Sequence, residues 1–436
     1  MALSRPVLHV FPKVQIIIWN AVDVRDLSDV VLIMSPTVTH FDFSVGGIGD
    51  DGQSFDAFCQ DAGARLPHLT FLAFRTSLPA SKYSASLAKL IRGSKDLEKF
   101  YVPRFGVTTD ILLALSGLQS LWRVQSMNTM DAPPTEEHIN DVEMVDSRDL
   151  TKGGFSSLTW LRLSANFHHI RAIVDHPYGP HSLTSIICDA LHNETPGQIR
   201  LLLTSIAAAC PQLLYLALIC VPTHERDLES LPCTWDSLRP ILQCRSLVQL
   251  VVRHSSPMEL TMANVEELAR DRATWTGISL APFPTVDIVY PSLTLSALIP
   301  FALHCPELKE LGLFVNGTRQ LPEIGDIGGE IQFSSLSQLE FGHSPISEEQ
   351  IEATALFLAG ICVRPVQIET KWRVSPVAPE PSTDLEFDRR ASLWSRVKRL
   401  QNEVCKSRWI LSLREENERL RKQIRDIGEE HQDNKG

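Results

Sequence analysis

Long apolar runs, metal-ligand pairs and secretion signals are all missing from this sequence of 436 residues. No stretch approaches the roughly 18 apolar residues that a membrane-spanning helix requires. The nine cysteines are scattered without a C-x-x-C pair, which argues against a zinc site and a disulfide framework. The first residues include one early Arg but no small-residue cleavage site. We therefore expect an intracellular protein, cytoplasmic or nuclear, with no membrane partner.

Signatures of catalysis and of cofactor binding are also scarce. The sequence holds no nucleophile elbow, phosphate loop or HExxH motif. The segment GGIGDDG places glycines at Gly47, Gly49 and Gly52, as in a dinucleotide-binding turn, but Asp50 and Asp51 would repel a pyrophosphate. We interpret it as a turn. The sequence predicts no catalytic residue and no cofactor.

One stretch, NFHHIRAIVDHPYGPH, gathers His168, His169, His176 and His181. Adjacent histidines on a strand would point to opposite sides, and no pair four residues apart on a helix is offered. We therefore expect no metal site in this stretch.

The composition favours a folded, acidic protein with a basic tail. Hydrophobic residues make up 44% and charged residues 21%, and the formal net charge of -11 disfavours nonspecific binding of nucleic acid. The segment from Asp388 to Asp426 departs from this balance, since it holds 12 Lys and Arg against 6 Asp and Glu.

A nine-residue phrase recurs along the chain, most clearly as CPQLLYLAL and CPELKELGL. Its fourth, seventh and ninth positions are apolar in every copy except at Arg123, and its second position is Pro in five of the ten copies. The copies begin at Phe11, Ser35, Leu66, Ser94, Leu115, Phe155, Cys210, Cys244, Cys305 and Phe333.

The phrase has the physical properties of a joint between a helix and a strand. Positions seven and nine face the same side of an extended chain, and a Pro at position two cannot continue a helix. Segments with helical spacing precede most copies, such as TTDILLALSG and QIRLLLTSIAAAC. Repeated units of this kind must stack to bury their apolar faces, with strands in one parallel sheet and helices outside. The intervals of 55 and 61 residues indicate either inserted loops or degenerate units.

The phrases CPxLxxLxL and FSSLxxLxF and the segment FGHSPIS resemble the repeat region of F-box/leucine-rich-repeat proteins of mushroom-forming fungi. The resemblance covers residues 1–365 and implies an α/β leucine-rich-repeat solenoid that recognises substrates for a ubiquitin ligase. The first phrase begins at Phe11, which leaves no room for an F-box before it. Cysteines at position one are expected to be buried, small apolar residues rather than reactive thiols.

Positions six and eight of the phrase would face the open, concave side of the sheet. Trp, Tyr and Arg are enriched at binding hot spots, so this side is the expected surface for an unknown protein ligand. The candidate partner-binding residues are Phe71, Lys99, Tyr101, Trp122, Trp160, Arg162 and Tyr215. An acidic inserted loop near residues 126–154 could cover these side chains instead, and the sequence leaves both possibilities open.

The C-terminal part of the chain has a different pattern. Residues 366–385 form an expected Pro-rich linker, residues 386–428 a coiled-coil helix and residues 429–436 a disordered tail. Asn at a core position and the pair of Glu416 with Arg421 favour a parallel homodimer. The heptad core positions are Ile410, Leu413, Asn417, Leu420, Ile424 and Ile427.

An upstream stripe does not share the seam of this heptad. It consists of Leu393, Val397, Leu400 and Val404, and it could pack on the last repeat instead of on a second chain. The helix also faintly resembles a basic-leucine-zipper DNA binder, but Asn402 and Arg408 are six residues apart where the family has eight, so nucleic acid is not the expected partner. If the C-terminal helix carries the function, the alternative is that the chain is a zipper-dimerised DNA-binding or scaffold protein.

Overall fold

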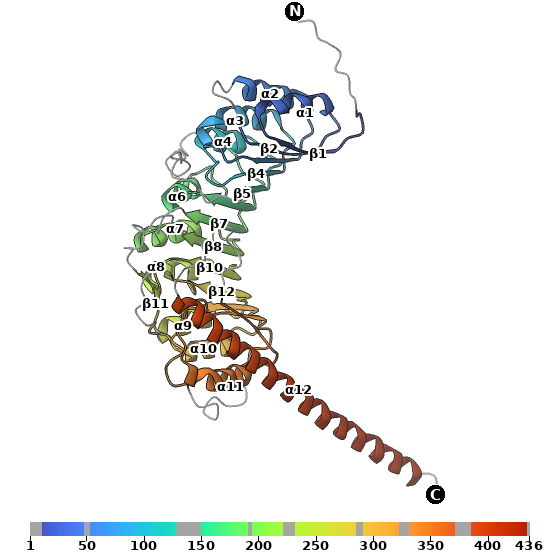
Figure 1. Cartoon of the computed structure of the whole chain (residues 1–436), viewed down its shortest axis with the longest axis vertical. Helices are drawn as coiled ribbons and strands as arrows, with labels where there is room; N and C mark the ends of the chain where they lie inside the picture. Colours follow the sequence, from blue (N-terminus) through green and yellow to red (C-terminus); the bar gives the residue numbers. More distant parts are fainter. Residues whose placement is uncertain are drawn as a thin grey trace, which may run out of the picture. The chain divides into compact units, whose positions relative to one another are not determined.

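The computed structural model describes residues 11–47, 53–127, 150–190, 194–220, 232–284, 291–321, 331–370 and 385–433. The described residues fall into two compact units, one that ends at Met258 and one that starts at Glu259. We call them unit 1 and unit 2 and describe each by itself. In each unit, strands are backed by helices (Figure 1).

Unit 1 contains a parallel sheet whose strands follow one another in chain order. Each strand pairs in register with the next, for example through Ile17 with Phe41 and Phe41 with Leu72. The strands are β1 (Ile16–Ala21), β2 (His40–Val45), β3 (Phe71–Arg75), β4 (Lys99–Pro103), β5 (Arg123–Met127), β6 (Trp160–Ser164), β7 (Ser185–Ala190), β8 (Tyr215–Cys220) and β10 (Gln249–Arg253).

Helices connect these strands, because parallel neighbours require a crossover. They pack against one another on one face of the sheet (Figure 1). The helices are α1 (Leu27–Ile33), α2 (Gln53–Arg65), α3 (Ser84–Gly93), α4 (Thr109–Ser116), α6 (Phe167–Asp175), α7 (Pro196–Ala209) and α8 (Trp235–Leu238). The two-residue strand β9 (Cys233–Thr234) accompanies them, and β11 (Met258–Glu259) contains the last residue of unit 1 and the first of unit 2.

Unit 2 repeats the same arrangement. Its parallel strands β12 (Gly277–Leu280), β13 (Glu310–Leu313), β14 (Gln338–Glu340) and β15 (Gln367–Glu369) also follow chain order. Its helices are α9 (Met262–Asp271), α10 (Leu298–His304), α11 (Ile351–Ile361) and the long α12 (Leu385–Asp433).

The predicted repeat is confirmed in both units. In the copy that contains β2, the residues at positions four, seven and nine are Val38, Phe41 and Phe43, and all three are fully buried. The carbonyl oxygen of Thr39, at position five, accepts the N–H of Thr70 in the next copy at 2.9 Å. Burial of the apolar positions and this backbone link together hold each copy against its neighbour.

The long intervals between phrases contain degenerate copies that the sequence analysis missed. Strand β7 lies between the phrases at Phe155 and Cys210, and β12 lies between those at Cys244 and Cys305. Strand β15 adds a further copy after the predicted end of the solenoid at residue 365, in the segment assigned to the linker. The rest of that linker, residues 371–384, lies outside the described residues.

The cysteines at position one are buried, as the sequence predicts. Cys210 and Cys305 follow the ends of α7 and α10, and burial raises the pKa of each thiol to about 12. The Cys305 thiol lies 3.4 Å from the carbonyl oxygen of Ala269. These side chains are therefore core residues at the turn from helix to strand, and at neutral pH their thiols stay protonated.

The first part of α12 closes the core of unit 2. Trp394 is fully buried, its ring stacks on Phe341 with centroids 4.2 Å apart, and its indole N–H donates to the carbonyl oxygen of Ser344 at 2.9 Å. Leu393 and Val397 are buried on the same side of the helix. The structure thus selects the intramolecular alternative for the start of the upstream stripe.

The start of α12 packs on the segment FGHSPIS, residues 341–347. Gly342 has a φ of +51°, and a Cβ there would collide with the carbonyl oxygen of Pro282. His343 stacks on Phe387 at 4.0 Å, and its carbonyl oxygen accepts the guanidinium of Arg390 at 3.1 Å. The segment therefore turns sharply to present backbone acceptors and a flat ring to α12.

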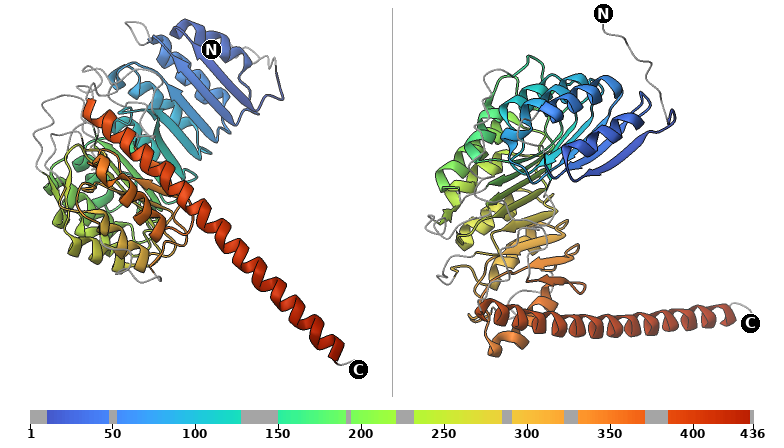
Figure 2. Two further views of the ribbon diagram at one scale, coloured as in Figure 1. Left: turned by 60° about the horizontal axis from the view of Figure 1, so that its bottom comes forward. Right: turned by 45° about the horizontal axis from the view of Figure 1, so that its top comes forward.

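The packed part of α12 ends near Arg408. Gln401 and Cys405 are buried, and Arg408 donates to the carbonyl oxygen of Ala359 in α11 at 2.6 Å. Leu400 and Val404, the other members of the stripe, are only half-buried. Beyond this point the helix extends away from the other elements of unit 2 (Figure 2) and continues to Asp433, past its predicted end at residue 428.

Candidate functional site

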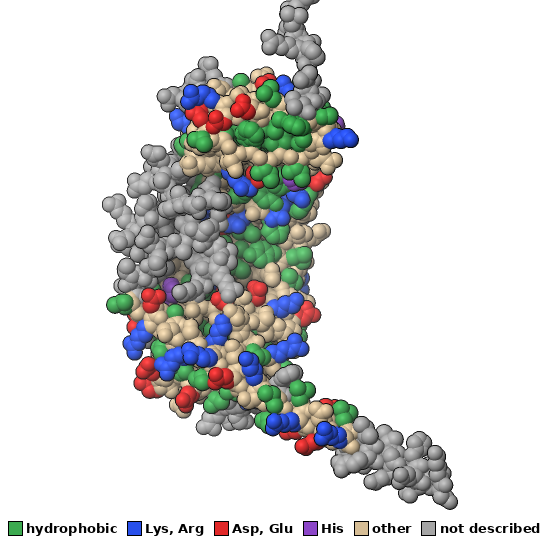
Figure 3. Space-filling model, turned by 45° about the vertical axis from the view of Figure 1, so that its right-hand side comes forward, with side chains coloured by type: hydrophobic (Ala, Val, Ile, Leu, Met, Phe, Trp, Pro, Cys, Tyr) green, Lys and Arg blue, Asp and Glu red, His purple; other side chains and the backbone are tan. Residues whose placement is uncertain are grey.

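The candidate site is the face of the unit 1 sheet that the helices leave uncovered. Because side chains alternate along a strand, positions six and eight of each phrase share this face. Hydrophobic and basic side chains lie together on the strand side of the unit (Figure 3). We call this surface the open strand face and define it by half-buried side chains of β2 to β8, namely His40, Phe71, Lys99, Tyr101, Arg123, Gln125, Trp160, Arg162 and Tyr215.

The rings on β2, β3 and β4 form the first half of a continuous file across the strands. His40 stacks on Phe71 with centroids 4.2 Å apart and planes 6° from parallel. Phe71 lies 5.0 Å from Tyr101, and the guanidinium of Arg123 lies 5.6 Å from the centre of the Tyr101 ring. Neighbours on both sides therefore cover Phe71 and Tyr101.

The second half of the file is centred on Trp160. The guanidinium of Arg123 on β5 lies 4.5 Å from the centre of the indole, within the range of a cation–π contact. From the other side, Tyr215 on β8 stacks on the same indole at 6.5 Å and 7°. The intervening β7 carries the small Ser185 at this level, which lets the two rings approach. The indole N–H of Trp160 has no acceptor among the described residues.

The register of the phrase around β5 differs from the predicted one, so Trp122 does not stand at position eight. Lys99 pairs with Arg123, so Arg123 occupies position six and Trp122 occupies position five, just before β5. The phrase begins at Leu118 rather than at Leu115. Trp122 still borders the face, because the ammonium group of Lys99 lies 5.1 Å from the centre of its ring.

The register error also hid the cation at the centre of the site. The predicted register puts Arg123 at an apolar position of the phrase, whereas its side chain joins the two halves of the file. Its guanidinium donates to the neutral amide oxygen of Gln125 at 2.7 Å. In the described part of the chain, no carboxylate lies within ion-pair distance of Arg123 or Lys99.

A second group of cations lies beside the file. Arg162 on β6 forms an ion pair with Asp189 on β7 at 2.9 Å, and their side chains are 17% and 3% exposed. Burial lowers the pKa of the Arg104 guanidinium, Asp189 raises it and Arg162 lowers it further. The Nε–H of Arg104 has no acceptor among the described residues. Asp189 therefore forms an ion pair with one guanidinium group and raises the pKa of a second.

The corresponding face of unit 2 has the opposite character. Gln338 and Gln367 each donate to a glutamate on the same strand, Glu340 at 3.1 Å and Glu369 at 2.8 Å. Ser279 donates to Glu340 at 2.8 Å. This face carries carboxylates and amides instead of rings and cations, so the two units present different chemistry on equivalent positions.

The first part of the histidine-rich stretch, with His168 and His169, forms helix α6. The rings of His168 and His169 lie 3.8 Å apart, and His176 packs beside Tyr178. Across the described residues, no group of three or more His, Cys, Asp or Glu side chains is placed to hold a metal ion. Most of the glycine-rich turn, residues 48–52, lies outside the described residues.

His169 makes the stability of the fold depend on pH. Burial, together with His168, lowers the pKa of His169 from 6.5 to about 4. The unfolded chain therefore binds a proton at His169 more readily than the folded chain does. Above pH 6.5 this difference costs no stability. As the pH falls from 6.5 toward 4, it lowers the free energy of unfolding by at most about 1.4 kcal/mol per pH unit.

We expect His169→Leu to stabilise the chain below pH 6.5 and to flatten this dependence, since neither ring nitrogen has a hydrogen-bond partner among the described residues. Urea midpoints measured across this pH range test the change. The exposed His181 provides the control, because His181→Leu should leave the slope unchanged. An equal slope in wild type and His169→Leu would contradict the assignment.

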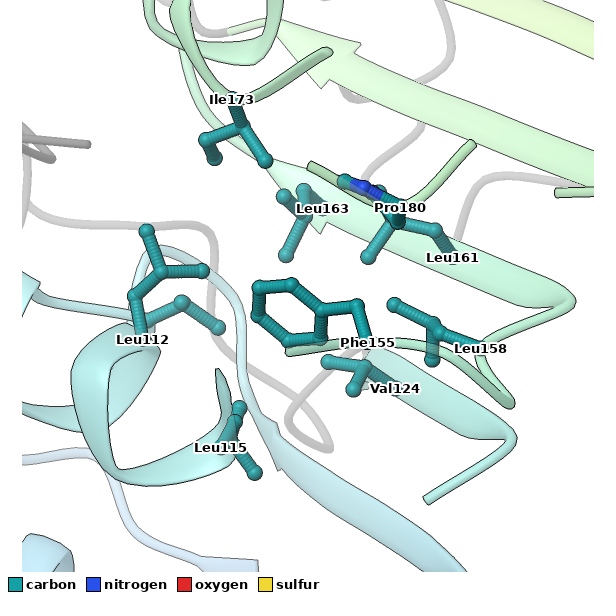
Figure 4. Close-up of a pocket in the computed structure, with 10 residues that line it drawn as sticks. Leu112, Leu115, Val124, Phe155, Leu158, Leu161, Leu163, Ile173 and Pro180 are labelled. Atoms are coloured by element: carbon teal, nitrogen blue, oxygen red, sulfur yellow. The ribbon is translucent and has the colours of Figure 1, made fainter. Parts of the chain in front are cut away.

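A small cavity lies in the core of unit 1 beneath β5 and β6 (Figure 4). Its volume is about 10 Å³, and its walls are apolar side chains that include Val124, Phe155 and Leu161. A cavity of this size holds at most about one water molecule. It is a packing gap between repeats and offers no room for a substrate.

The proposed dimer residues lie on the part of α12 that extends away from the other elements of unit 2. Ile410, Leu413 and Leu420 are 47%, 43% and 46% exposed, and the Asn417 amide donates to the carbonyl oxygen of Leu413 at 3.0 Å. The side chains of Ile424 and Ile427 lie outside the described residues. In the described part of the chain, no helix combines the length and the apolar character needed to cross a membrane.

No family model and no curated protein matches this chain. Solved structures that are similar to it include an internalin from Listeria monocytogenes, with 12% identity, a TM-score of 0.38 and coverage of 79% of this chain and 78% of that one. The Toll–Spatzle complex from Drosophila is similar with 11% identity and a TM-score of 0.37, and the match covers 77% of this chain and 40% of that one. The Rad7–Elc1 complex from yeast is similar with 14% identity and a TM-score of 0.35, and the match covers 76% of this chain and 81% of that one.

The class of the protein follows from its own topology. Copies of a strand, a turn and a helix stack with the strands parallel and in chain order, and in most copies the same three positions are apolar and buried. This arrangement defines an α/β leucine-rich-repeat fold, here followed by a long C-terminal helix. The fold class predicted from the sequence is confirmed.

Proposed function

We propose that this chain is a non-catalytic protein-recognition module that binds a segment of another protein on the open strand face of unit 1. The observation that carries the proposal is the file of stacked rings around Arg123 and Trp160. Rings and guanidinium groups fixed by their neighbours lose little side-chain entropy when a partner covers them. Substitution of such a residue at the centre of an interface typically weakens binding by about 2 kcal/mol or more.

A finer role as a substrate receptor related to F-box ubiquitin-ligase proteins is supported by the sequence resemblance alone. The phrases CPxLxxLxL and FSSLxxLxF carry it. Co-purification with the adaptor protein of a cullin ligase tests this role separately. Recovery of the adaptor with the chain would support a docking element, whereas its absence would leave recognition without ligase attachment.

We expect Trp160→Ala to reduce recovery of the bound protein by about 30-fold, since a loss of about 2 kcal/mol corresponds to that ratio. The measurement is affinity purification with quantitative mass spectrometry, and thermal melting checks that the variant is folded. Leu201 is 51% exposed on α7, so Leu201→Ala is the matched control. Equal recovery by Trp160→Ala and wild type would refute the proposed face.

The other occupant considered for this face is the chain's own acidic loop near residues 126–154. Residues 128–149 of that loop lie outside the described residues. Neutralising their Asp and Glu side chains should increase partner recovery if the loop competes for the face. If recovery of the partner protein is unchanged, the loop does not compete with the partner for the open strand face.

We also propose that the distal part of α12 pairs with a second copy of the chain. Exposed Ile410, Leu413 and Leu420 at heptad spacing support this pairing. In a parallel pair, Glu416 of one helix would meet Arg421 of the other, which adds charge complementarity. The scaffold and DNA-binding alternatives both use this helix, and a zipper without a matched basic stripe favours the scaffold.

A further inference from the structure

We infer that the open strand face of unit 1 is selective for an acidic segment, an extended stretch of the partner protein rich in Asp or Glu. This inference rests on the proposed function and specifies the chemistry of its partner. It follows from the charges on the face, from the orientation of the file and from the length that the file spans.

The charges on β4 to β7 do not balance. Lys99 and Arg123 make contacts with rings and a neutral amide, Arg162 forms an ion pair with Asp189, and the same carboxylate raises the pKa of Arg104. Three cations on these strands, with Arg104 directly after β4, therefore have one carboxylate, Asp189, to balance them. Desolvating cations against a neutral partner is unfavourable, whereas carboxylates in the partner would supply the missing counter-charge.

The neighbouring carboxylate on β2 does not change this balance. Asp42 is already paired with Arg75 on β3, with 2.6 Å between the carboxylate oxygen and the guanidinium nitrogen. Burial raises the pKa of Asp42, and Arg75 and His40 lower it. His40 faces the same group, and burial and then Lys99 lower the pKa of its imidazole. At neutral pH these groups add no net negative charge to the face.

The rings of the file favour the same kind of partner. An aromatic ring is negative on its faces and positive at its edge. Arg123 and Tyr215 occupy the two faces of Trp160, and Phe71 and Arg123 lie on either side of Tyr101. The ring edges are therefore what these residues can still offer to a partner, and positive edges complement carboxylate oxygens.

This orientation distinguishes the face from a nucleic-acid platform. Proteins that bind single strands also combine cations with aromatic rings, but the bases stack on free ring faces. Here the neighbours in the file already cover those faces. The net charge of -11 of the whole chain also opposes a polyanion that extends beyond the site.

The length of the file sets the length of the segment. From β2 to β8 the file crosses six strand spacings, or about 29 Å at about 4.8 Å each. An extended peptide covers that distance with about 9 residues at about 3.3 Å each. A short linear segment can therefore contact every cation of the face at once.

The test uses a fluorescent peptide of about 12 residues that alternates Glu and Ser, so that it can span the file. The matched peptide carries Gln in place of Glu, and an oligo-dT of the same number of nucleotides tests nucleic acid. Fluorescence anisotropy is measured with the full chain and with a second receptor in which the acidic side chains of residues 128–149 are neutralised, so that this segment cannot compete.

We expect the Glu peptide to bind at least one receptor about 10-fold more tightly than the Gln peptide, and more weakly as salt rises. Arg123→Gln should reduce its affinity by about 10-fold, whereas Arg200→Gln on the exposed side of α7 should not. Equal binding of both peptides, binding of neither, or tighter binding of oligo-dT would overturn the inference. If the Glu peptide does not bind but Trp160→Ala still reduces recovery of the partner protein, the inferred acidic chemistry is wrong and the proposed function stands.

Discussion

Trp394→Ala should lower the free energy of unfolding of unit 2 by about 3–5 kcal/mol, the range for deleting a fully buried aromatic side chain. The indole has no exposed surface, stacks on Phe341 and donates its N–H to the carbonyl oxygen of Ser344. Its removal would leave a cavity and an unpaired carbonyl group between α12 and the seat formed by FGHSPIS. A loss of this size is a large fraction of the stability of an ordinary domain.

Hydrogen exchange of α11, resolved by mass spectrometry, is the appropriate measurement because it reports on unit 2 alone. We expect faster exchange in α11 with unchanged exchange in α3. Leu411→Ala is the matched control, since Leu411 lies on the same helix but is 56% exposed, and it should change stability by less than about 0.5 kcal/mol. Trp394→Phe should have an intermediate effect. Equal exchange in Trp394→Ala and Leu411→Ala would show that α12 does not close the core.

Deleting residues 409–436 should more than halve the mass in solution, from two full chains of 48.7 kDa each to a single shortened chain. The deletion removes the exposed heptad residues, including Leu413 and Leu420, but keeps the packed part of α12 up to Arg408. Multi-angle light scattering provides the measurement. About three heptads form a weak pair, so the full chain must be examined at several concentrations.

Point variants separate pairing from truncation. Leu413→Lys with Leu420→Lys places like charges in the seam and should also give a single chain, whereas Leu411→Lys should remain paired. A deletion that starts at residue 386 is unsuitable, because it also removes Trp394 and exposes the core of unit 2. A full chain that has the mass of one copy at every concentration would refute dimerisation.

The repeat could be predicted from the sequence because it depends on local spacing. Three apolar positions and a recurrent Pro are visible without knowledge of the neighbouring strands. The pattern weakens in the copies at β12 and β15, whereas the copy at β7 keeps the apolar Leu183, Ile186 and Cys188 at the three positions. In β12 the large Trp275 replaces Leu at position four, and before β15 the same position is the exposed Pro365.

The site was harder to predict because it depends on pairing between strands. Leu118, Leu121 and Val124 are spaced three apart, so two registers of the phrase around β5 have similar apolar patterns. Only the pairing of Lys99 with Arg123 selects one of them. A slip of three residues moves each side chain to the other face, which is why Trp122 was selected and Arg123 was overlooked.

The two roles of α12 show a similar limit. The sequence predicted two stripes with different phases but left open which surface each stripe contacts. Burial of Leu393 and Val397 assigns the first stripe to unit 2, with Trp394 as its largest contact. Trp394 lay outside the predicted stripe, and nothing in its spacing marked it as the closing residue.

Site-specific photo-crosslinking can show whether partners bind the open strand face of unit 1. A photoreactive residue at Gln125, on the face, is compared with one at Arg200, on the helical side. We predict partner adducts from position 125 that disappear when Arg123→Gln is introduced, and none from position 200. Adducts of equal yield from both positions, or adducts from position 125 that survive Arg123→Gln and Trp160→Ala, would contradict the account.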